Sequence, residues 1–327
     1  MSGCSVHVGR LDRVPLAVSP HPGATLFSLV FKVLTGMRTD VPAPLRTLVR
    51  EALPPSRAAA VHTVFAAGCW APDTLSLTRD LGAGGEAAVQ AELDALDPDL
   101  FLADLHREYG ETPARRWRAA AARPREFLDG YRAAVSAVWE GLRPLWRAAE
   151  PHLRREQERV GLAAVTGNLD ALVGSLGGRV RYADGAFTLP HDCPGHLADV
   201  GKRPVVLVPL ASGYMADSYS AERDDVLWFG YPLPGLAQVL ASAAPASATD
   251  ADRLALLLGR ARAGILRSAL RQPSLSETAR HVGLSVSTAS YHCDQLTHAG
   301  LLLRQRQGQQ VRLHLTDKGN ALLDLLA

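Results

Sequence analysis

The sequence predicts a mainly α-helical chain with small β elements, arranged as a large N-terminal domain and a small C-terminal one. Apolar residues recur at three- and four-residue steps through several long segments, which is the spacing of one buried helix face. Short apolar runs between 178 and 234, and again between 301 and 315, are bounded by proline and glycine, as is typical of strands. An uncharged Ala/Ser/Pro/Thr stretch at 241–249 is the expected linker between domains over 1–240 and 250–327.

The composition is that of an ordinary globular protein. Of its 327 residues, 47% are hydrophobic and 21% charged, so the chain can bury cores without disulfides or metals. No basic segment followed by an apolar run opens the sequence, and no stretch reaches the length of a membrane span. We therefore expect a cytoplasmic protein with no membrane partner. The cysteines lack the paired spacing of a disulfide framework or a zinc knuckle; they are Cys4, Cys69, Cys193 and Cys293.

The first domain is expected to contain a long helix from Glu126 onward, where apolar residues fall on one face. Pro144 or Pro151 is expected to kink or end this helix, because proline removes a backbone donor and crowds the preceding turn. Aromatic side chains could line a pocket for an effector, but we expect most of them to lie in the core. The aromatic residues considered are Trp117, Tyr131, Trp139, Trp146 and Trp228.

Strands are expected near the end of the first domain. Residues 179–189 predict a hairpin around an Asp-Gly turn at 184–185. Two apolar runs, 204–210 and 225–231, predict further strands. The sequence therefore predicts one small sheet beside the helices.

The second domain begins with helical patterns. Residues 254–271 predict a single helix that ends before Pro273. Ser274 and Glu277 have the spacing of a capping box, in which each side chain bonds the backbone amide of the other residue. Gly283 can adopt the backbone conformation needed for a sharp turn, so a short helix should end there.

A second helix and a hairpin are expected next. Ser285 can cap this helix, and Gly300 ends it. Its inward-facing side chains are expected to be Ala289, Cys293 and Leu296. The runs 301–306 and 311–315 predict a hairpin, and a final apolar helix should begin near Asp317. Together these elements predict a winged helix-turn-helix at the C-terminal end.

This arrangement predicts double-stranded DNA as a partner. Small hydroxyl groups can approach phosphates and base edges closely, and a glutamine amide can pair with adenine. The expected recognition-helix contacts are Ser285, Ser287, Thr288, Ser290, Tyr291 and Gln295. The expected contacts from the wing are Arg304, Arg306, Gln309 and Arg312. From residue 252 onward ten Lys/Arg residues accompany five acidic ones, a net charge of +5 against −3 for the rest of the chain.

Four segments of the second domain match, in order, the pattern of the ArsR-type winged-helix repressors. They are LLGRAR at 257–262, GLSVSTAS at 283–290, AGL at 299–301 and LTDKG at 315–319. The first domain is similar, at 16–20 and 70–73, to a poorly characterised domain that precedes this module in some bacterial regulators.

The resemblance implies a homodimer that binds a palindromic operator, usually as a repressor released by a small-molecule effector. The paired cysteines of the metal-sensing branch are missing at the start of the recognition helix. Cys293 occupies a position where the family has a core leucine, so we expect a small buried apolar side chain there.

Other residue patterns give weaker indications of function. His191, Cys193 and His196 have ligand-like spacing but no second pair, so no metal or other cofactor is expected. Neither the Gly-rich segment 82–85 nor 211–214 has the flanking residues of a nucleotide or hydrolase motif, so no catalytic residues are expected. Two alternatives stay open: a winged helix that binds a protein, favoured by the lack of Lys and Arg between 285 and 300, and a small-molecule enzyme with an appended regulatory domain.

Overall fold

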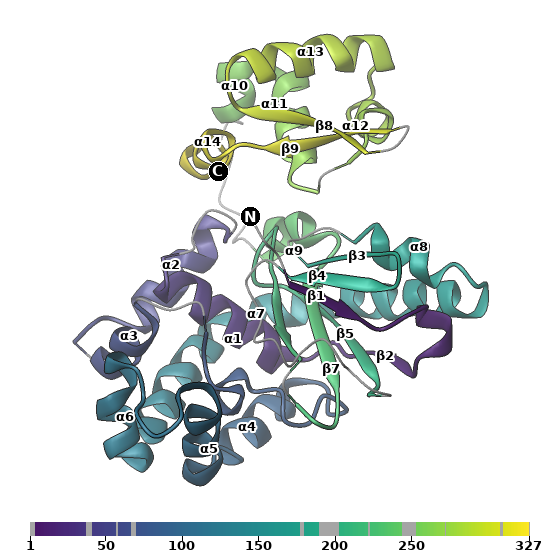
Figure 1. Ribbon diagram of the computed structural model, residues 1–327. Coiled ribbons are helices and arrows are strands. Elements are labelled where there is room, and N and C mark those ends of the chain that lie inside the picture. Colours follow the sequence, from purple (N-terminus) through teal and green to yellow (C-terminus); the bar gives the residue numbers. More distant parts are fainter. Residues whose placement is uncertain are drawn as a thin grey trace. The chain divides into compact units, whose positions relative to one another are not determined.

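The computed structural model describes residues 4–326 except 37–40, 57, 67–69, 177–179, 190–202, 222, 244–252, 272 and 308–309. The described part of the chain is mainly α, with about 59% of its residues in helices and three small sheets (Figure 1). It forms two compact units, Met1–Ala243 and Ala244–Ala327. Of the expected linker at 241–249, the first three residues belong to a helix, and the rest lies outside the described residues.

Nine α-helices are described in the first unit, several of them around one long helix. They are α1 (Pro22–Leu34), α2 (Ala43–Ala52), α3 (Ala59–Phe65), α4 (Glu86–Asp94), α5 (Pro98–Tyr109), α6 (Arg118–Ala122), α7 (Pro124–Val165), α8 (Leu169–Gly174) and α9 (Leu236–Ala243). Short 3₁₀ turns lie at Leu11–Arg13, Asp73–Ser76 and Arg115–Trp117. Helix α7 packs against α1, α2, α3, α5 and α9.

The expected break in the long helix is wrong, because α7 runs without interruption through both prolines. Proline removes one ladder hydrogen bond, which costs several kcal/mol in an isolated helix. In α7 this cost is offset by burial near each proline, where Leu142, Leu145 and Leu153 are almost fully enclosed. Packing against the surrounding helices has therefore overridden the local signal.

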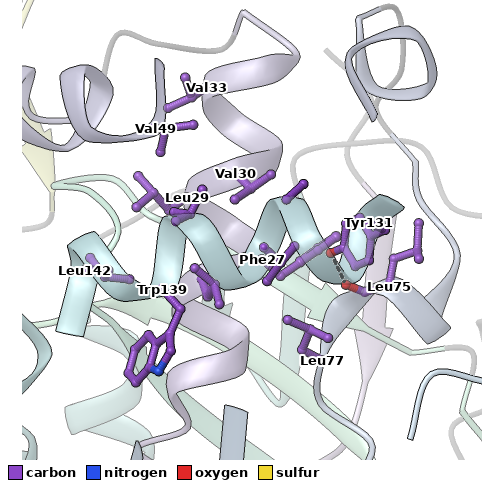
Figure 2. Close-up of a cluster of buried hydrophobic side chains, with 14 of the residues drawn as sticks. Phe27, Leu29, Val30, Val33, Val49, Leu75, Leu77, Tyr131, Trp139 and Leu142 are labelled. Carbon is purple, nitrogen blue, oxygen red and sulfur yellow. Dashed lines mark hydrogen bonds between the residues drawn. The ribbon is translucent and has the colours of Figure 1, made fainter. Parts of the chain in front are cut away.

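The main core lies between α7 and the helices of the N-terminal third (Figure 2). Its side chains include Leu29 and Val30 of α1, together with Leu142 of α7. The Tyr131 hydroxyl donates a hydrogen bond of 2.6 Å to the carbonyl oxygen of Leu75. All five aromatic residues considered above are buried, so the expectation that most of them are core is confirmed.

The strands of the first unit form two sheets rather than one. A three-stranded antiparallel sheet has the order β1-β4-β3, and a four-stranded sheet has the order β2-β5-β7-β6 with β2, β5 and β7 parallel. The strands are β1 (Cys4–His7), β2 (Leu16–Val18), β3 (Arg181–Ala183), β4 (Ala186–Leu189), β5 (Val205–Leu210), β6 (Ser218–Ser220) and β7 (Leu227–Pro232).

The hairpin expected at 179–189 is confirmed as the antiparallel pair β3 and β4. Asp184 and Gly185 both have positive φ, 51° and 78°, as the tight turn between such strands requires. The strands expected at 204–210 and 225–231 are confirmed as β5 and β7. The sequence missed three short strands: β1 and β2, which pair with residues far along the chain, and β6, which pairs with the nearby β7.

The second unit contains five helices and one hairpin in its described part. These are α10 (Arg253–Leu258), α11 (Arg260–Ala269), α12 (Leu275–Val282), α13 (Val286–His298), β8 (Leu302–Gln307), β9 (Gln310–Leu315) and α14 (Asp317–Leu326). The single helix expected at 254–271 is wrong: Gly259, with φ 79° and ψ 152°, separates α10 from α11. That backbone conformation is open to glycine and ends a helix.

Other local predictions for the second unit are confirmed. The capping box is confirmed, with Ser274 accepting from the Glu277 amide and Glu277 accepting from the Ser274 amide. Gly283 has φ 72° and lies between α12 and α13. Cys293 is fully buried, as expected, in a core that α11, α13 and the β8–β9 hairpin share.

Candidate nucleic-acid interface

Helix α13 has one buried face and one hydroxyl-rich exposed face. Ser285 caps its first turn and accepts from the Thr288 amide at 3.1 Å. The Ser285 hydroxyl also lies 2.9 Å from that of Ser287 and 2.7 Å from that of Thr288. The three hydroxyls thus form one polar cluster at the N-terminal end of the helix, where backbone N–H groups also favour anions.

The two faces of α13 follow from its spacing. Ala289, Cys293 and Leu296 are buried in the core of the unit. The outward side chains include five of the six residues predicted to contact DNA: Ser285, Ser287, Thr288, Tyr291 and Gln295. Tyr291 is the largest of them and is 57% exposed.

The sixth residue, Ser290, is only half-exposed, because Arg304 of β8 reaches it. The Nη2 atom of Arg304 donates to the Ser290 carbonyl oxygen at 2.5 Å and lies 3.2 Å from the Ser290 hydroxyl. The other terminal nitrogen of Arg304 lies 2.7 Å from a carboxylate oxygen of Asp294. Arg304, predicted as a DNA contact, is therefore bound to α13 in the unbound protein.

The other residues of the hairpin that were predicted to contact DNA differ in their exposure. Arg306 is exposed on β8, opposite Val311 of β9. Arg312 is half-buried, and its backbone forms an isolated antiparallel β-bridge with Ser274 at the start of α12. Gln309 lies outside the described residues.

Electrostatics at the start of α12 follow from the capping box. Hydrogen bonding from the Ser274 backbone is the largest effect that lowers the pKa of Glu277 below its usual value. Arg312 adds a smaller coulombic contribution in the same direction. Strand β9 and the capping box are thereby coupled through charge as well as through the backbone.

Sequence reasoning missed the exposed apolar side chains of this unit. Val286 at the start of α13 is 50% exposed, and Leu303 of β8 is 56% exposed. On α10, Leu256 and Leu257 are 73% and 69% exposed. The sequence predicted one helix over 254–271, whereas the structure has two helices that meet at Gly259, with Leu256 and Leu257 exposed on the first.

The first unit contains a cavity of about 370 Å³ that no sequence motif indicated. It is lined by charged groups from three segments distant in the sequence, with Ala95 and Leu100 as its apolar part. Its charged residues are Asp73, Arg79, Glu92, Asp104, Arg107, Arg223, Asp224 and Asp225. The volume lies in the range of small-molecule sites.

Two carboxylates of this cavity are buried and held rigidly. Glu92 accepts from the backbone amides of Arg79 and Asp80, at 3.0 and 2.7 Å. Asp104 accepts from the amide and hydroxyl of Thr74, at 2.8 and 2.6 Å. Behind Glu92, at 3.8 Å, lies the fully buried ring of His21, whose pKa is lowered by burial.

The metal candidates His191, Cys193 and His196 lie outside the described residues. Within the described part, no three His, Cys, Asp or Glu side chains gather closely enough to bind a metal ion. Among the described helices, none combines the length and the apolar content needed to cross a bilayer. No protein-family model, curated protein or solved structure matches this chain.

Proposed function

We propose that this protein is a sequence-specific, DNA-binding transcriptional regulator whose second unit is a winged helix-turn-helix. The observation that carries the proposal is the exposed, serine- and threonine-rich face of α13, followed directly by a hairpin with an exposed arginine. In this assignment α12 and α13 are the helix-turn-helix, α13 is the recognition helix, and β8–β9 is the wing.

The chemistry of α13 suits the major groove. Hydroxyls at its N-terminal end can bond phosphates and base edges, and Gln295 can present both an acceptor and donors to adenine. Because α13 has no Lys or Arg, the electrostatic part of binding must come from other elements. Arg306 on the wing and exposed Arg280 on α12 are candidates for phosphate contacts.

We propose that the regulator is a homodimer formed through α10. Leu256 and Leu257 are adjacent in sequence and mostly exposed, whereas Leu254 of the same helix is buried. Helix α14 packs against α10, and its Leu322 and Leu323 pack against the core of the unit. Burying two leucines against a second copy removes apolar area from water, and a dimer would present two recognition helices to a palindromic operator.

The first unit is the proposed sensor, and its charged cavity is the candidate effector site. An effector changes DNA affinity only if it binds one of two states of the protein more tightly than the other. The mixed carboxylates and guanidinium groups of the cavity favour a small polar ligand over an apolar one. We propose no catalytic role for these residues.

A protein-binding module is the second candidate function. It is favoured by the exposed apolar residues Val286, Tyr291 and Leu303, and by the absence of cationic side chains on α13. A partner with an apolar patch would bury these side chains, whereas DNA would leave much of their area in contact with water and phosphates.

The deciding experiment is a mobility shift with DNA from the gene's own upstream region, against non-specific competitor at several salt concentrations. Saturable binding that survives competitor and weakens with salt supports the regulator. No preference over competitor at any salt concentration contradicts it, and a pull-down from the native host would then test the protein-binding alternative.

A further inference from the structure

Arg304 makes an unusual set of contacts for a residue on a wing. It reaches back to α13 and uses both terminal nitrogens there, on the Ser290 carbonyl oxygen and on the Asp294 carboxylate. Its side chain is only 25% exposed. Burial raises the pKa of the neighbouring Cys293 thiol, and Arg304 opposes this shift through a hydrogen bond and its positive charge.

The partners of Arg304 lie one turn apart on the same helix. Ser290 and Asp294 are four residues apart, so both lie on the same side of α13. Asp294 carries the only carboxylate between 285 and 300. A guanidinium has a planar arrangement of donors, so it can hold a carbonyl and a carboxylate together, which a lysine ammonium does less well.

We infer that Arg304 is a positioning residue that ties the β8–β9 hairpin to α13, and that it does not contact DNA phosphate. This inference rests on the proposed function, since it concerns how the wing and the recognition helix are held in one arrangement. The tie cancels the charge of Asp294 and fixes the distance between α13 and the strand that carries Arg306. Arg306, two residues away, then remains as the phosphate contact on β8.

The two roles of Arg304 predict opposite effects of changing Asp294. If Arg304 binds phosphate, Asp294→Ala frees its guanidinium and removes a negative charge near DNA, so binding should strengthen. If Arg304 is a tie, Asp294→Ala loosens the hairpin and binding should weaken. The sign of the change therefore separates the two roles.

The experiment uses the full chain and the operator fragment found by mobility shift. Arg304→Ala and Asp294→Ala are each expected to weaken operator binding by about tenfold, the cost of a lost charge-assisted hydrogen bond. The double variant should be no weaker than Arg304→Ala alone, because both changes remove one tie. Arg304→Lys should bind nearly as weakly as Arg304→Ala, whereas a phosphate contact would tolerate lysine.

The slope of log affinity against log salt should stay at its parent value in the Arg304 variants. The matched control is Arg306→Ala on the same strand. In this variant the negative slope should become less steep by about 0.9. Stronger binding by Asp294→Ala, or a slope lowered by about 0.9 in Arg304→Ala, would overturn the inference.

A second measurement does not depend on DNA. Amide hydrogen exchange of residues 302–307 in the free protein should accelerate in Arg304→Ala and in Asp294→Ala. If the parent protein binds no DNA, the proposed function fails while this exchange still tests the tie. Unchanged exchange in both tie variants would overturn the inference by itself.

Discussion

In the proposed DNA complex, Arg306 of β8 is a phosphate contact whose charge can be tested by itself. We expect Arg306→Ala to weaken binding to all DNA sequences by a similar factor and to lower the salt slope by about 0.9, because one counterion-releasing contact is lost. Titrations of specific and non-specific DNA at several salt concentrations measure both quantities. Arg155→Ala, on exposed surface of the first unit, removes the same charge and is the control. Equal slopes for parent and Arg306→Ala would count against the contact.

The buried Tyr131 hydroxyl contributes to the stability of the first unit. Burial raises the pKa of Tyr131, so its phenol stays protonated and remains the donor to Leu75. Tyr131→Phe leaves that carbonyl without its buried partner, and we expect a loss of about 1–3 kcal/mol in the free energy of unfolding of the first unit. Chemical denaturation, monitored by tryptophan fluorescence, measures this loss in the free energy of unfolding. Tyr291→Phe changes an exposed ring and should stay within about 0.5 kcal/mol of the parent.

At the scale of elements, the capping box of α12 gives a pH dependence with a definite sign. The folded pKa of Glu277 is lowered, so its ionised form contributes stability above its unfolded pKa and this contribution is lost as pH falls through the folded pKa. Glu277→Gln should therefore be less stable than the parent at pH near 7, and the gap should narrow below pH of about 4. Thermal unfolding at both pH values tests this, and a gap independent of pH would contradict it.

The break between α10 and α11 depends on one backbone conformation. Gly259 has φ 79° and ψ 152°, and an added Cβ would meet nothing within 4 Å, so the cost of Gly259→Ala is backbone strain alone. We expect a loss of about 1–3 kcal/mol in the free energy of unfolding of the second unit. Gly161→Ala, within α7 and also without a close neighbour, is the control and should stabilise by about 0.5–1 kcal/mol. Equal effects of both changes would disprove a special role for Gly259.

At the scale of the whole molecule, the proposed dimer rests on two exposed leucines. Leu257→Glu places a charge in the proposed interface, so we expect a monomer by light scattering at concentrations where the parent is a dimer. Affinity for an operator with two half-sites should fall, while affinity for a single half-site should stay the same. Leu162→Glu, on α7 of the first unit, alters a side chain of similar exposure and is the control. A dimer unaffected by Leu257→Glu would locate the interface elsewhere.

Short-range patterns were predicted well because their causes lie within a few residues. The Ser274 and Glu277 capping box, the Asp184–Gly185 turn and the inward face of α13 were all found where expected. Each depends on backbone geometry or on side-chain spacing within one turn of structure. The DNA-binding assignment of α13 stays a prediction, built on the same local spacing.

The errors arose where distant residues decide the outcome. Pro144 and Pro151 stay within α7 because helices from the N-terminal third pack along it. The strands β1 and β2 are too short to stand out in the sequence, and pairing with β4 and β5 defines them. The charged cavity likewise assembles residues from 73 to 107 with residues 223–225.

The sequence by itself determined the helical character of the chain, the hairpins, the caps and the exposed face of α13, because these follow from periodicity and local hydrogen bonding. Only the tertiary structure decided how exposed each residue of the predicted DNA interface is and what it contacts. Arg304 and Arg306 are equivalent in the sequence, two residues apart on one strand. Folding packs β8 against α13, which brings Asp294 and Ser290 against Arg304, whereas the side chain of Arg306 is exposed.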